Sequence, residues 1–327
     1  MTNYSIDRLI ADSQAIKIVQ AQENLRSDAT QGPFIQELLR ETIGQVFRYE
    51  YAATPWAAGQ VIDIRTGDEG ATSWRHVERG YVGQAKIVAD NATDLPAADV
   101  EGKEILHSVH TIGMFFEYST QEMRSAARMS RQGLGDIIAD KAASLRSDVD
   151  RLVDNLMRTG DPNYSNLYGV CNAPGINVVA APTGNWLTAT SDEIIADFAA
   201  GYNAAIVDTD YVEEVNTVCI PAAQYQRMIE LQKSVASDKN VLQWLQANYP
   251  QITNWVRDYG MKDAGAGGNA ALLFLRRDPQ AVFGMVNMPL RPLPVERRGL
   301  SLKVPFEMRY GGIGLPRPKS VTRLDGV

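Results

Sequence analysis

The sequence predicts an α+β fold, and three observations lead to this prediction. An apolar stripe at alternating steps of four and three indicates a long amphipathic helix that stops near Thr159-Gly160. An earlier stretch, 52–112, has no helical period and contains short strand-like pieces. Helical and strand-like segments then alternate over 176–290, which is typical of a compact mixed domain.

The overall composition is that of an ordinary globular protein. The chain has 327 residues, of which 45% are hydrophobic and 22% charged, and these values exclude wholesale disorder. It is long enough for two domains, or for one domain with large excursions. The sequence contains no apolar run of about 18 residues, and its first residues lack a basic region followed by an apolar segment. We therefore expect neither a membrane span nor a secretory signal, and synthesis in a cytoplasm.

The first third of the chain contains few large apolar side chains. Residues 2–30 form a weakly amphipathic arm that needs a partner to stay ordered, and a short helix over Pro33–Arg40 and a strand over Gln45–Tyr51 follow it. The next strand-like pieces are Gln60–Arg65, Ser73–Arg79, Gln84–Ala89 and Glu104–Ile112. A loosely amphipathic hairpin region of about sixty residues can hardly make a core of its own, so we expect it to lie on something else.

A helix start, a break and a longer helix come next. Ser119-Thr-Gln-Glu122 has the capping-box pattern, in which the serine and glutamate side chains accept hydrogen bonds from backbone amides. Gly133 and Gly135 are expected to interrupt this first helix, and Asp136 can cap the second. The apolar stripe of the second helix consists of Ile138, Ala142, Leu145, Val149, Leu152 and Leu156. A corner rich in glycine, proline and asparagine follows over 160–175.

The elements of the mixed segment and the tail follow from caps, turn formers and alternation. Ser191 is expected to cap a helix. The inner face of this helix is expected to hold Ile194, Ile195, Phe198, Tyr202 and Ile206. The next expected elements are a strand over Val215–Ile220, helices over Ala222–Ser234 and Asn240–Asn248, a turn over Ala264–Asn269 and a strand over Ala271–Leu275. The tail returns to strands at Pro292–Val295, Ser301–Val304 and Phe306–Tyr310.

The net charge of −7 hides an asymmetry along the chain. Residues 274–327 contain ten Lys/Arg against four Asp/Glu, a local charge of +6, so the preceding residues carry −13. A basic tail can bind nucleic acid, but these side chains are spread along strands and among prolines, which dilutes any basic patch. We predict salt bridges with acidic neighbours, within the chain or between copies, and leave phosphate contact as the alternative.

Candidate chemical groups are few. His107 and His110 lie three apart in one expected strand, where alternation sends them to opposite faces, so we do not expect them to share a metal ion. Cys171 and Cys219 are interpreted as packing residues. The run Gly265–Asn269 precedes a strand and lacks the lysine of a phosphate loop, so we expect a surface turn. We predict no metal site, no cofactor and no enzyme activity.

Two further groups have a structural and a functional interpretation. The acidic pairs Glu213-Glu214 and Asp208/Asp210 could bind a hard cation, but their spacing does not match a calcium loop, and we expect a solvated face. The tryptophans of the mixed segment could stack on single-stranded nucleic acid, but aromatic residues at helical spacing are usually core residues. These tryptophans are Trp186, Trp244 and Trp255.

Three local features, in their order along the chain, resemble one protein family. Gly83–Asp90, followed by Asp94-Leu-Pro96 and Val100, is similar to the extended loop of one capsid branch, and Tyr118–Met123 is similar to the start of the peripheral-domain helices. Leu167–Gly175 is similar to the glycine and proline corner after the spine helix. Together they resemble the major capsid proteins of tailed bacteriophages, whose Hong Kong 97-like fold encapsulins share.

The resemblance implies a division of the chain into five parts. They are an N-terminal arm with the start of the peripheral domain (1–51), an extended β-hairpin loop (52–112), the peripheral domain with its spine helix (113–175), the axial domain (176–290), and peripheral-domain strands with the C-terminus (291–327).

The resemblance further implies a structural function in a virion. The chain is expected to self-assemble as pentamers and hexamers into an icosahedral or prolate head around double-stranded DNA, and to be made in the bacterial host cytoplasm. Expected partners are further copies of the chain, a portal, a scaffold, decoration proteins, and packaged DNA through non-specific contacts. No membrane is expected. The N-terminus lacks a long charged coiled coil to serve as an internal scaffolding domain, so we expect either a separate scaffold protein or a chain that is a mature processed form.

Two groups of residues are expected to matter for assembly. If the hairpin lies across an adjacent subunit, Arg75, Glu78 and Arg79 are available for ion pairs between copies. The joint between peripheral and axial domains is expected at Gly160, Gly169, Pro174 and Gly175. Two alternatives stay open: an encapsulin-like nanocompartment shell that encloses protein cargo, and an α/β hydrolase-type enzyme in which the hairpin is a lid.

Overall fold

The computed structural model describes residues 51–87, 97–131, 137–164, 166–234 and 238–327. The chain divides into two units, 1–48 with 126–136 and 49–125 with 137–327, and the second unit holds both sheets described below. The helix expected over Pro33–Arg40, most of the strand expected over Gln45–Tyr51, and the glycine break at 133–135 with its cap Asp136 lie outside the described residues.

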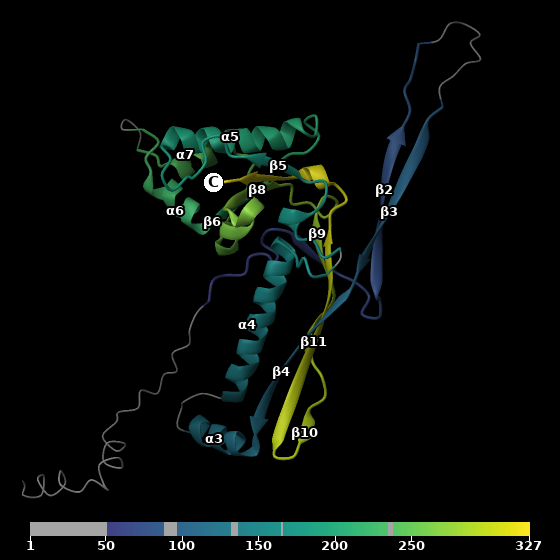
Figure 1. Cartoon of the computed structure of the whole chain (residues 1–327), viewed down its shortest axis with the longest axis vertical. Coiled ribbons are helices and arrows are strands. Elements are labelled where there is room, and N and C mark those ends of the chain that lie inside the picture. Colours follow the sequence, from purple (N-terminus) through teal and green to yellow (C-terminus); the bar gives the residue numbers. More distant parts are fainter. Residues whose placement is uncertain (1–50, 88–96, 132–136, 165, 235–237) are drawn as a thin grey trace, which may run out of the picture. The chain divides into compact units, whose positions relative to one another are not determined.

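The first sheet is built around one long strand, β11 (Ser301–Gly314). Strand β4 (His110–Ser119) pairs antiparallel with β11 over its whole length, and β9 (Phe283–Pro292) also pairs with β11. Two short strands complete the sheet, β1 (Asp63–Thr66) beside β9 and β10 (Glu296–Arg298) beside β11. Figure 1 shows β4 and β11 running side by side.

The tail therefore differs from its prediction. Residues 293–295 are not a strand, and β11 is one continuous strand where two were expected. It continues through Pro305, whose carbonyl accepts a hydrogen bond from the Leu293 amide at 2.8 Å. Proline lacks an amide donor but keeps its carbonyl acceptor, so the strand can continue through Pro305 with hydrogen bonding at the carbonyl alone.

Helix α3 (Thr120–Arg131) begins where the sequence predicts. The Glu122 amide donates to Ser119 Oγ at 3.1 Å, and the Ser119 amide donates to Glu122 Oε2 at 2.9 Å. These two bonds are the reciprocal capping box. The Lys141 ammonium group adds a hydrogen bond to the same carboxylate and to the Glu117 carbonyl.

Helix α4 (Ile137–Arg158) is the predicted long helix, with one correction to its apolar stripe. Leu145, Val149 and Leu156 are buried as expected, but Leu152 is 44% exposed. Val153 is 3% exposed and takes its place. The buried face follows steps of four, four and three from Leu145, and these side chains join a core that includes Tyr310.

The second sheet is ordered β5 (Asn177–Ala180), β12 (Val321–Asp325), β8 (Ala271–Leu275), β6 (Thr217–Pro221) and β7 (Asn254–Asp258). All five residues of β8 are buried, because alternate side chains enter two different cores. Leu273 and Leu275 join the core that contains α4, whereas Leu272 and Phe274 join the core under the helices of the mixed segment. The sequence of a strand that is buried on both faces is a continuous run of apolar residues.

The helices of the mixed segment are α5 (Ser191–Val207), α6 (Ala222–Glu230) and α7 (Val241–Asn248). Thr190, one residue before the predicted Ser191, caps α5 in a capping box with Glu193. Ile194, Phe198 and Tyr202 are buried as predicted, whereas Ile195 and Ile206 are partly buried. Short 3-10 turns lie at Val170–Asn172, Tyr259–Asp263, Ala266–Gly268 and Pro318–Ser320.

Two strands were not predicted from the sequence. Strand β9, most of which lies within the segment 176–290, pairs with β11 in the first sheet. Strand β12, near the end of the segment 291–327, pairs with β5 and β8 in the second sheet. Both differences arise because sheet membership depends on pairing between distant segments, which local alternation does not encode.

Candidate functional site

A largely exposed two-stranded hairpin is formed by β2 (Ser73–Val82) and β3 (Asp99–Ser108). Ten residue pairs join the strands in one antiparallel register, from Ser73 opposite Ser108 to Val82 opposite Asp99. The strands predicted at Gln84–Ala89 and Glu104–Ile112 need correction. Residues 84–87 are not a strand, β3 ends at Ser108, and β4 begins at His110 and pairs with β11.

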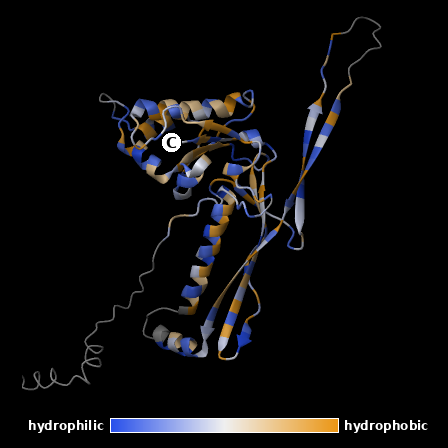
Figure 2. Cartoon of the chain, viewed as in Figure 1, coloured by the Kyte–Doolittle hydropathy of each residue, from blue (hydrophilic) through white to orange (hydrophobic). Residues whose placement is uncertain are grey.

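One side of this hairpin, which we call the outer face, combines exposed apolar and charged side chains. Tyr81 lies opposite Val100 in the register, and Arg75 lies opposite Leu106. The exposed fractions of the apolar residues are 53% for Val77, 91% for Tyr81, 52% for Val100 and 61% for Leu106. Figure 2 shows the mixture of polar and apolar residues along both strands. Exposed apolar side chains at alternate positions of two paired strands form a surface suited to contact with another protein.

The three residues predicted to make ion pairs between copies do not share a face. Arg75 and Arg79 lie on the outer face, and Arg75 already forms an exposed ion pair with Glu104, with 2.9 Å between Nη1 and Oε1. Within the described residues, no salt bridge reaches Arg79. Glu78 lies on the opposite face, where its Oε1 is 3.4 Å from His76 Nε2. Alternation in a strand separates neighbours such as Glu78 and Arg79.

The base of the hairpin is attached to the first sheet through Trp74. Its indole Nε1 donates to the Gly311 carbonyl at 2.6 Å, and its ring stacks on His107 at 4.1 Å between centroids with 10° between planes. A side chain at Gly311 would collide with this contact, because a Cβ there would lie 2.8 Å from Trp74 Nε1.

A second contact at the base joins the two hairpin histidines. His107 Nε2 lies 3.1 Å from His76 Nδ1, so Glu78, His76, His107 and Trp74 form a continuous row. Burial, and then the charge of His76, lower the pKa of His107 to about 4. His107 and His110 were expected in one strand, but they lie on two different strands, β3 and β4. The His76–His107 contact was missed, because it depends on the pairing register of two strands whose histidines are 31 residues apart, which local alternation does not encode.

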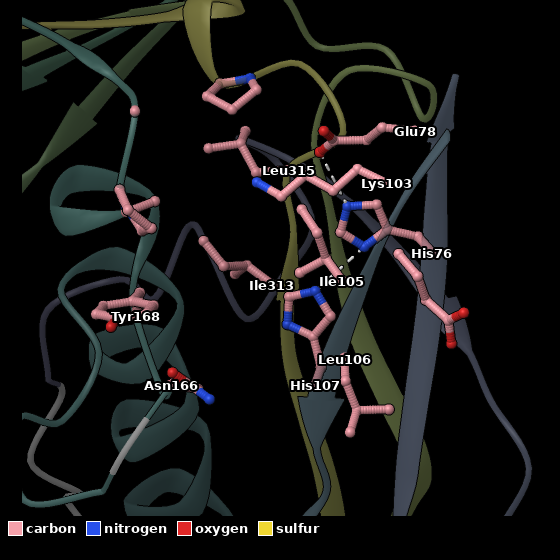
Figure 3. Close-up of a pocket in the computed structure, with 15 residues that line it drawn as sticks. His76, Glu78, Lys103, Ile105, Leu106, His107, Asn166, Tyr168, Ile313 and Leu315 are labelled. Carbon is pink, nitrogen blue, oxygen red and sulfur yellow. Dashed lines mark hydrogen bonds and ion pairs between the residues drawn. The ribbon is translucent and has the colours of Figure 1, made fainter. Parts of the chain in front are cut away.

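A groove of about 590 Å³ lies between the hairpin base and the corner after α4 (Figure 3). His76, Lys103 and Ile105 line one side, and Tyr168 and Pro174 line the other. Figure 3 shows Ile313 and Leu315 between these two sides.

The corner after α4 is closed by backbone contacts at two of the predicted glycines. Gly160 has a φ of +74°, and Gly160 and Tyr168 form an isolated antiparallel bridge. A Cβ at Gly169 would lie 2.3 Å from the Thr159 amide nitrogen, so the backbone needs glycine there to return onto the helix end. Gly175 has a φ of +87°, and Pro174 is exposed at the groove. Gly160 and Gly169 thus meet at the end of α4, whereas Pro174 and Gly175 lie at the groove.

A buried charge cluster connects α4 with β7. Arg158 Nη1 donates to Asp154 Oδ2 at 2.9 Å and to Asp258 Oδ2 at 3.2 Å. Trp56 joins both carboxylates, because its amide donates to Asp154 Oδ1 and its indole donates to Asp258 Oδ2, each at 2.8 Å. Burial raises the pKa of Asp154, although the Trp56 amide and Arg158 oppose this effect. The cluster ties the end of the long helix to the second sheet.

The basic tail forms salt bridges within the chain, as predicted. Arg276 and Arg317 both bind the Glu213 carboxylate, at 2.9 and 2.8 Å, and Arg277 binds Asp63 at 2.8 Å. The expectation that Glu213 lies on a solvated face is wrong, because Glu213 is 7% exposed between the two guanidinium groups. Further pairs are Arg291–Glu69, Arg298–Glu296, Lys319–Asp208 and Arg323–Asp325.

The remaining candidate chemical groups lie in the interior. Cys171 and Cys219 are buried, as predicted, and burial raises the pKa of Cys171 to about 12 and that of Cys219 well above its usual value. Trp186 is fully buried, and Trp244 and Trp255 pack partly buried against the same core. Among the described residues, no group of three His, Cys, Asp or Glu side chains could hold a metal ion. No helix in the same part of the chain is long and apolar enough to cross a membrane.

Solved structures with the same fold are capsids and a related particle. The capsid of Myoviridae phage XM1 aligns with a TM-score of 0.77 and 17% identity, covering 89% of this chain and 98% of that one. Microbacterium phage Oxtober96 aligns at 0.63 with 13% identity, covering 91% and 99%. A virus-like particle from Pyrococcus furiosus aligns at 0.51 with 11% identity, covering 82% and 91%. These similarities establish the Hong Kong 97-like α+β fold that the sequence predicts.

The family follows from a separate comparison. A search of curated proteins found no match. The family model described as major capsid protein matches residues 83–327, which is three quarters of the chain and contains the hairpin strand β3, α4, the corner and most of both sheets. The chain therefore belongs to the major capsid protein family, and it is a structural protein of a capsid shell and not an enzyme.

Proposed function

We propose that copies of this chain assemble as pentamers and hexamers into the icosahedral or prolate head of a tailed bacteriophage, around its double-stranded DNA. Membership of the major capsid protein family and the fold shared with the phage XM1 capsid support this proposal. Assembly in the bacterial cytoplasm with a portal, a separate scaffold and decoration proteins belongs to the same proposal, as does non-specific contact with the packaged DNA.

The main observation in support of this proposal is the exposed outer face of the hairpin. Its exposed apolar residues Val77, Tyr81, Val100 and Leu106 are not covered by any described part of the chain. In a shell, the neighbouring copy covers such a face, and each apolar side chain that it buries contributes to the contact at about 25 cal/mol per Å². We propose that the hairpin lies across an adjacent copy, with Arg75 and Arg79 forming ion pairs there and Glu78 remaining at the groove.

We further propose the domain division in a revised form. The axial domain comprises the second sheet with α5, α6 and α7, and it takes β12 from the C-terminal end of the chain. The peripheral domain comprises α4 and the first sheet, including β9. The corner at Gly160–Gly175 and the charge cluster of Asp154, Arg158 and Asp258 then form the joint between the two domains.

The decisive experiment shortens the hairpin without disturbing its base. Replacing Gly80–Glu101 by an Asn-Gly turn joins Arg79 to Gly102, which face each other in the register, and it leaves Trp74 and His107 in place. We expect the shortened chain to fold, with native thermal unfolding, and to form no shells by electron microscopy. Shells of native size from this variant would refute the role of the hairpin.

A point variant tests the outer face alone. Tyr81→Ser combined with Val100→Ser removes the facing apolar pair, and we expect assembly to fail or to need a much higher protein concentration. Leu187→Ser is the matched control, because Leu187 is 48% exposed but lies far from the hairpin in the sequence, in the mixed segment. Nuclease-protected DNA inside particles made in infected cells supports a phage head, whereas particles filled with one host protein support the nanocompartment alternative.

A further inference from the structure

The row of Glu78, His76, His107 and Trp74 sits where the hairpin is attached to the rest of the chain. Trp74 is the last side chain of this row and makes the hydrogen bond to the Gly311 carbonyl on β11. His107 stacks on Trp74 and touches His76, and His76 touches Glu78 (Figure 3). The attachment of the hairpin therefore includes two titratable rings in direct contact.

The contact between the two rings allows only one proton between the facing nitrogens. At 3.1 Å, His107 Nε2 and His76 Nδ1 are at hydrogen-bond distance, so one nitrogen carries a proton and the other accepts it. If both rings become imidazolium ions, both nitrogens are donors, the hydrogen bond is lost and two like charges face each other. Glu78 touches only the far nitrogen of His76, Nε2, so it does not neutralise His107.

We propose that this histidine pair is an acid-sensitive latch, which holds the hairpin base on β11 near neutral pH and releases it when His107 gains a proton. The inference concerns a property of the single chain, so it does not depend on how copies contact each other in a shell. It assigns to His76 and His107 a function that is independent of the contacts between copies.

The surroundings of His107 favour this response. The titratable groups around the groove and the pair are His76 and Glu78 on β2, Lys103 and Glu104 on β3, and Tyr168 in the corner. Gly311 and Ile313 face the base from β11 and carry no charge, and Phe283 of β9 packs on Trp74 with 5.6 Å between ring centroids. Among these groups, only His76 touches His107 directly, because the carboxylates of Glu78 and Glu104 face other partners, His76 and Arg75.

The direction of the response follows from linkage. His107 has a pKa of about 4 in the attached hairpin and about 6.5 when exposed to water, so the released state binds the proton more tightly. The contribution of His107 to the stability of the attached state is therefore complete above about pH 6.5. It is lost as the pH falls to 4, and it changes little below that pH. The ratio of released to attached hairpin can rise by up to about 10²-fold over this interval, since 1 pKa unit corresponds to a tenfold change.

The test uses the unassembled full-length chain labelled with 5-fluorotryptophan. The chain has five tryptophans, and Trp74→Phe identifies the fluorine signal of Trp74. Between pH 7.5 and 4, we expect that signal to shift and to become broadened by a soluble paramagnetic probe, which reports exposure to water. The signals of Trp56 and Trp186, which are fully buried in the two cores, should stay unchanged and show that the chain remains folded.

Two variants separate the latch from other effects of acid. His107→Phe keeps an aromatic ring on Trp74 but cannot titrate, so exposure of Trp74 should not change with pH in this variant. His110→Gln is the matched control, because His110 packs on Tyr164 outside the row, and the native response should persist. The proposal is overturned if the native Trp74 signal shows no gain in exposure, if it shifts without broadening, or if His107→Phe responds like the native chain.

Discussion

Removing the cation from the buried cluster at the end of α4 should destabilise the chain more than any surface change of the same chemistry. Asp154 is 5% exposed and Asp258 is 1% exposed, and Arg158 is the cation that pairs with both. Arg158→Met keeps the length of the side chain and leaves two buried carboxylates without a counter-charge. Breaking a buried ion pair in this way costs about 3–5 kcal/mol of unfolding free energy.

Thermal unfolding of the unassembled chain measures this loss. The unfolding entropy grows with chain length, so in a chain of 327 residues a loss of 1 kcal/mol lowers Tm by about 1.5 °C, and we expect a decrease of about 4–7 °C for Arg158→Met at pH 7.5. Arg146→Met is the matched control, because Arg146 is an exposed arginine on the same helix, and its effect should stay within about 0.5 kcal/mol.

The pH dependence of the stability of Arg158→Met gives a second test. Burial already raises the pKa of Asp154, and loss of Arg158 raises it further, since the charged form loses its partner. A carboxyl group with a raised pKa binds protons more tightly in the folded state, so lowering the pH favours folding. The deficit of Arg158→Met relative to the native chain should therefore shrink between pH 7.5 and 5. Equal losses for Arg158→Met and Arg146→Met, or a deficit that grows at lower pH, would refute the reasoning.

Three further predictions concern the corner, the tail and α3. Gly169→Val should prevent folding or assembly, because its Cβ would lie 2.3 Å from a backbone nitrogen. Gly175→Val should mainly add strain of about 1–2 kcal/mol from its positive φ, because its Cβ would lie 3.2 Å from Pro318. Measurements of soluble yield and Tm show which of the two variants is more damaged. Glu213→Gln should cost about 1–3 kcal/mol by chemical denaturation, because Arg276 and Arg317 share this carboxylate, and an unchanged midpoint would contradict the pairing. Ser119→Ala should cost about 1 kcal/mol and speed hydrogen exchange at Glu122, while leaving exchange in α7 unchanged.

Elements that depend on neighbours in the sequence were predicted well. The capping box at Ser119 and Glu122, the end of α4 before Gly160, and the start of α7 at Asn240 all involve groups within four residues of one another. Their hydrogen bonds form in one turn of helix whatever surrounds it. The glycine corner was predictable for the same reason, because positive φ values favour glycine locally.

Errors occurred where packing decides between local options. Leu152 and Val153 are adjacent apolar residues on α4, and only the position of the neighbouring sheet determines that Val153 is buried and Leu152 is exposed. Glu213 follows Val212 in a polar stretch, and only Arg276 and Arg317, which are 63 and 104 residues away, make it a buried anion. Helical periodicity leaves such choices open, since one residue step turns a side chain by about 100°.

The sequence by itself determined the α+β class, the long helix, the corner, the salt-bridging character of the basic tail and the resemblance to capsid proteins, because these rest on periodicity, caps, composition and motif order. Only the tertiary structure decided that β9 pairs in the first sheet and β12 in the second, and that His76 meets His107 beside Trp74. The physical reason is strand register, which is set by pairing between distant segments and changes the face of every side chain when it moves by one residue.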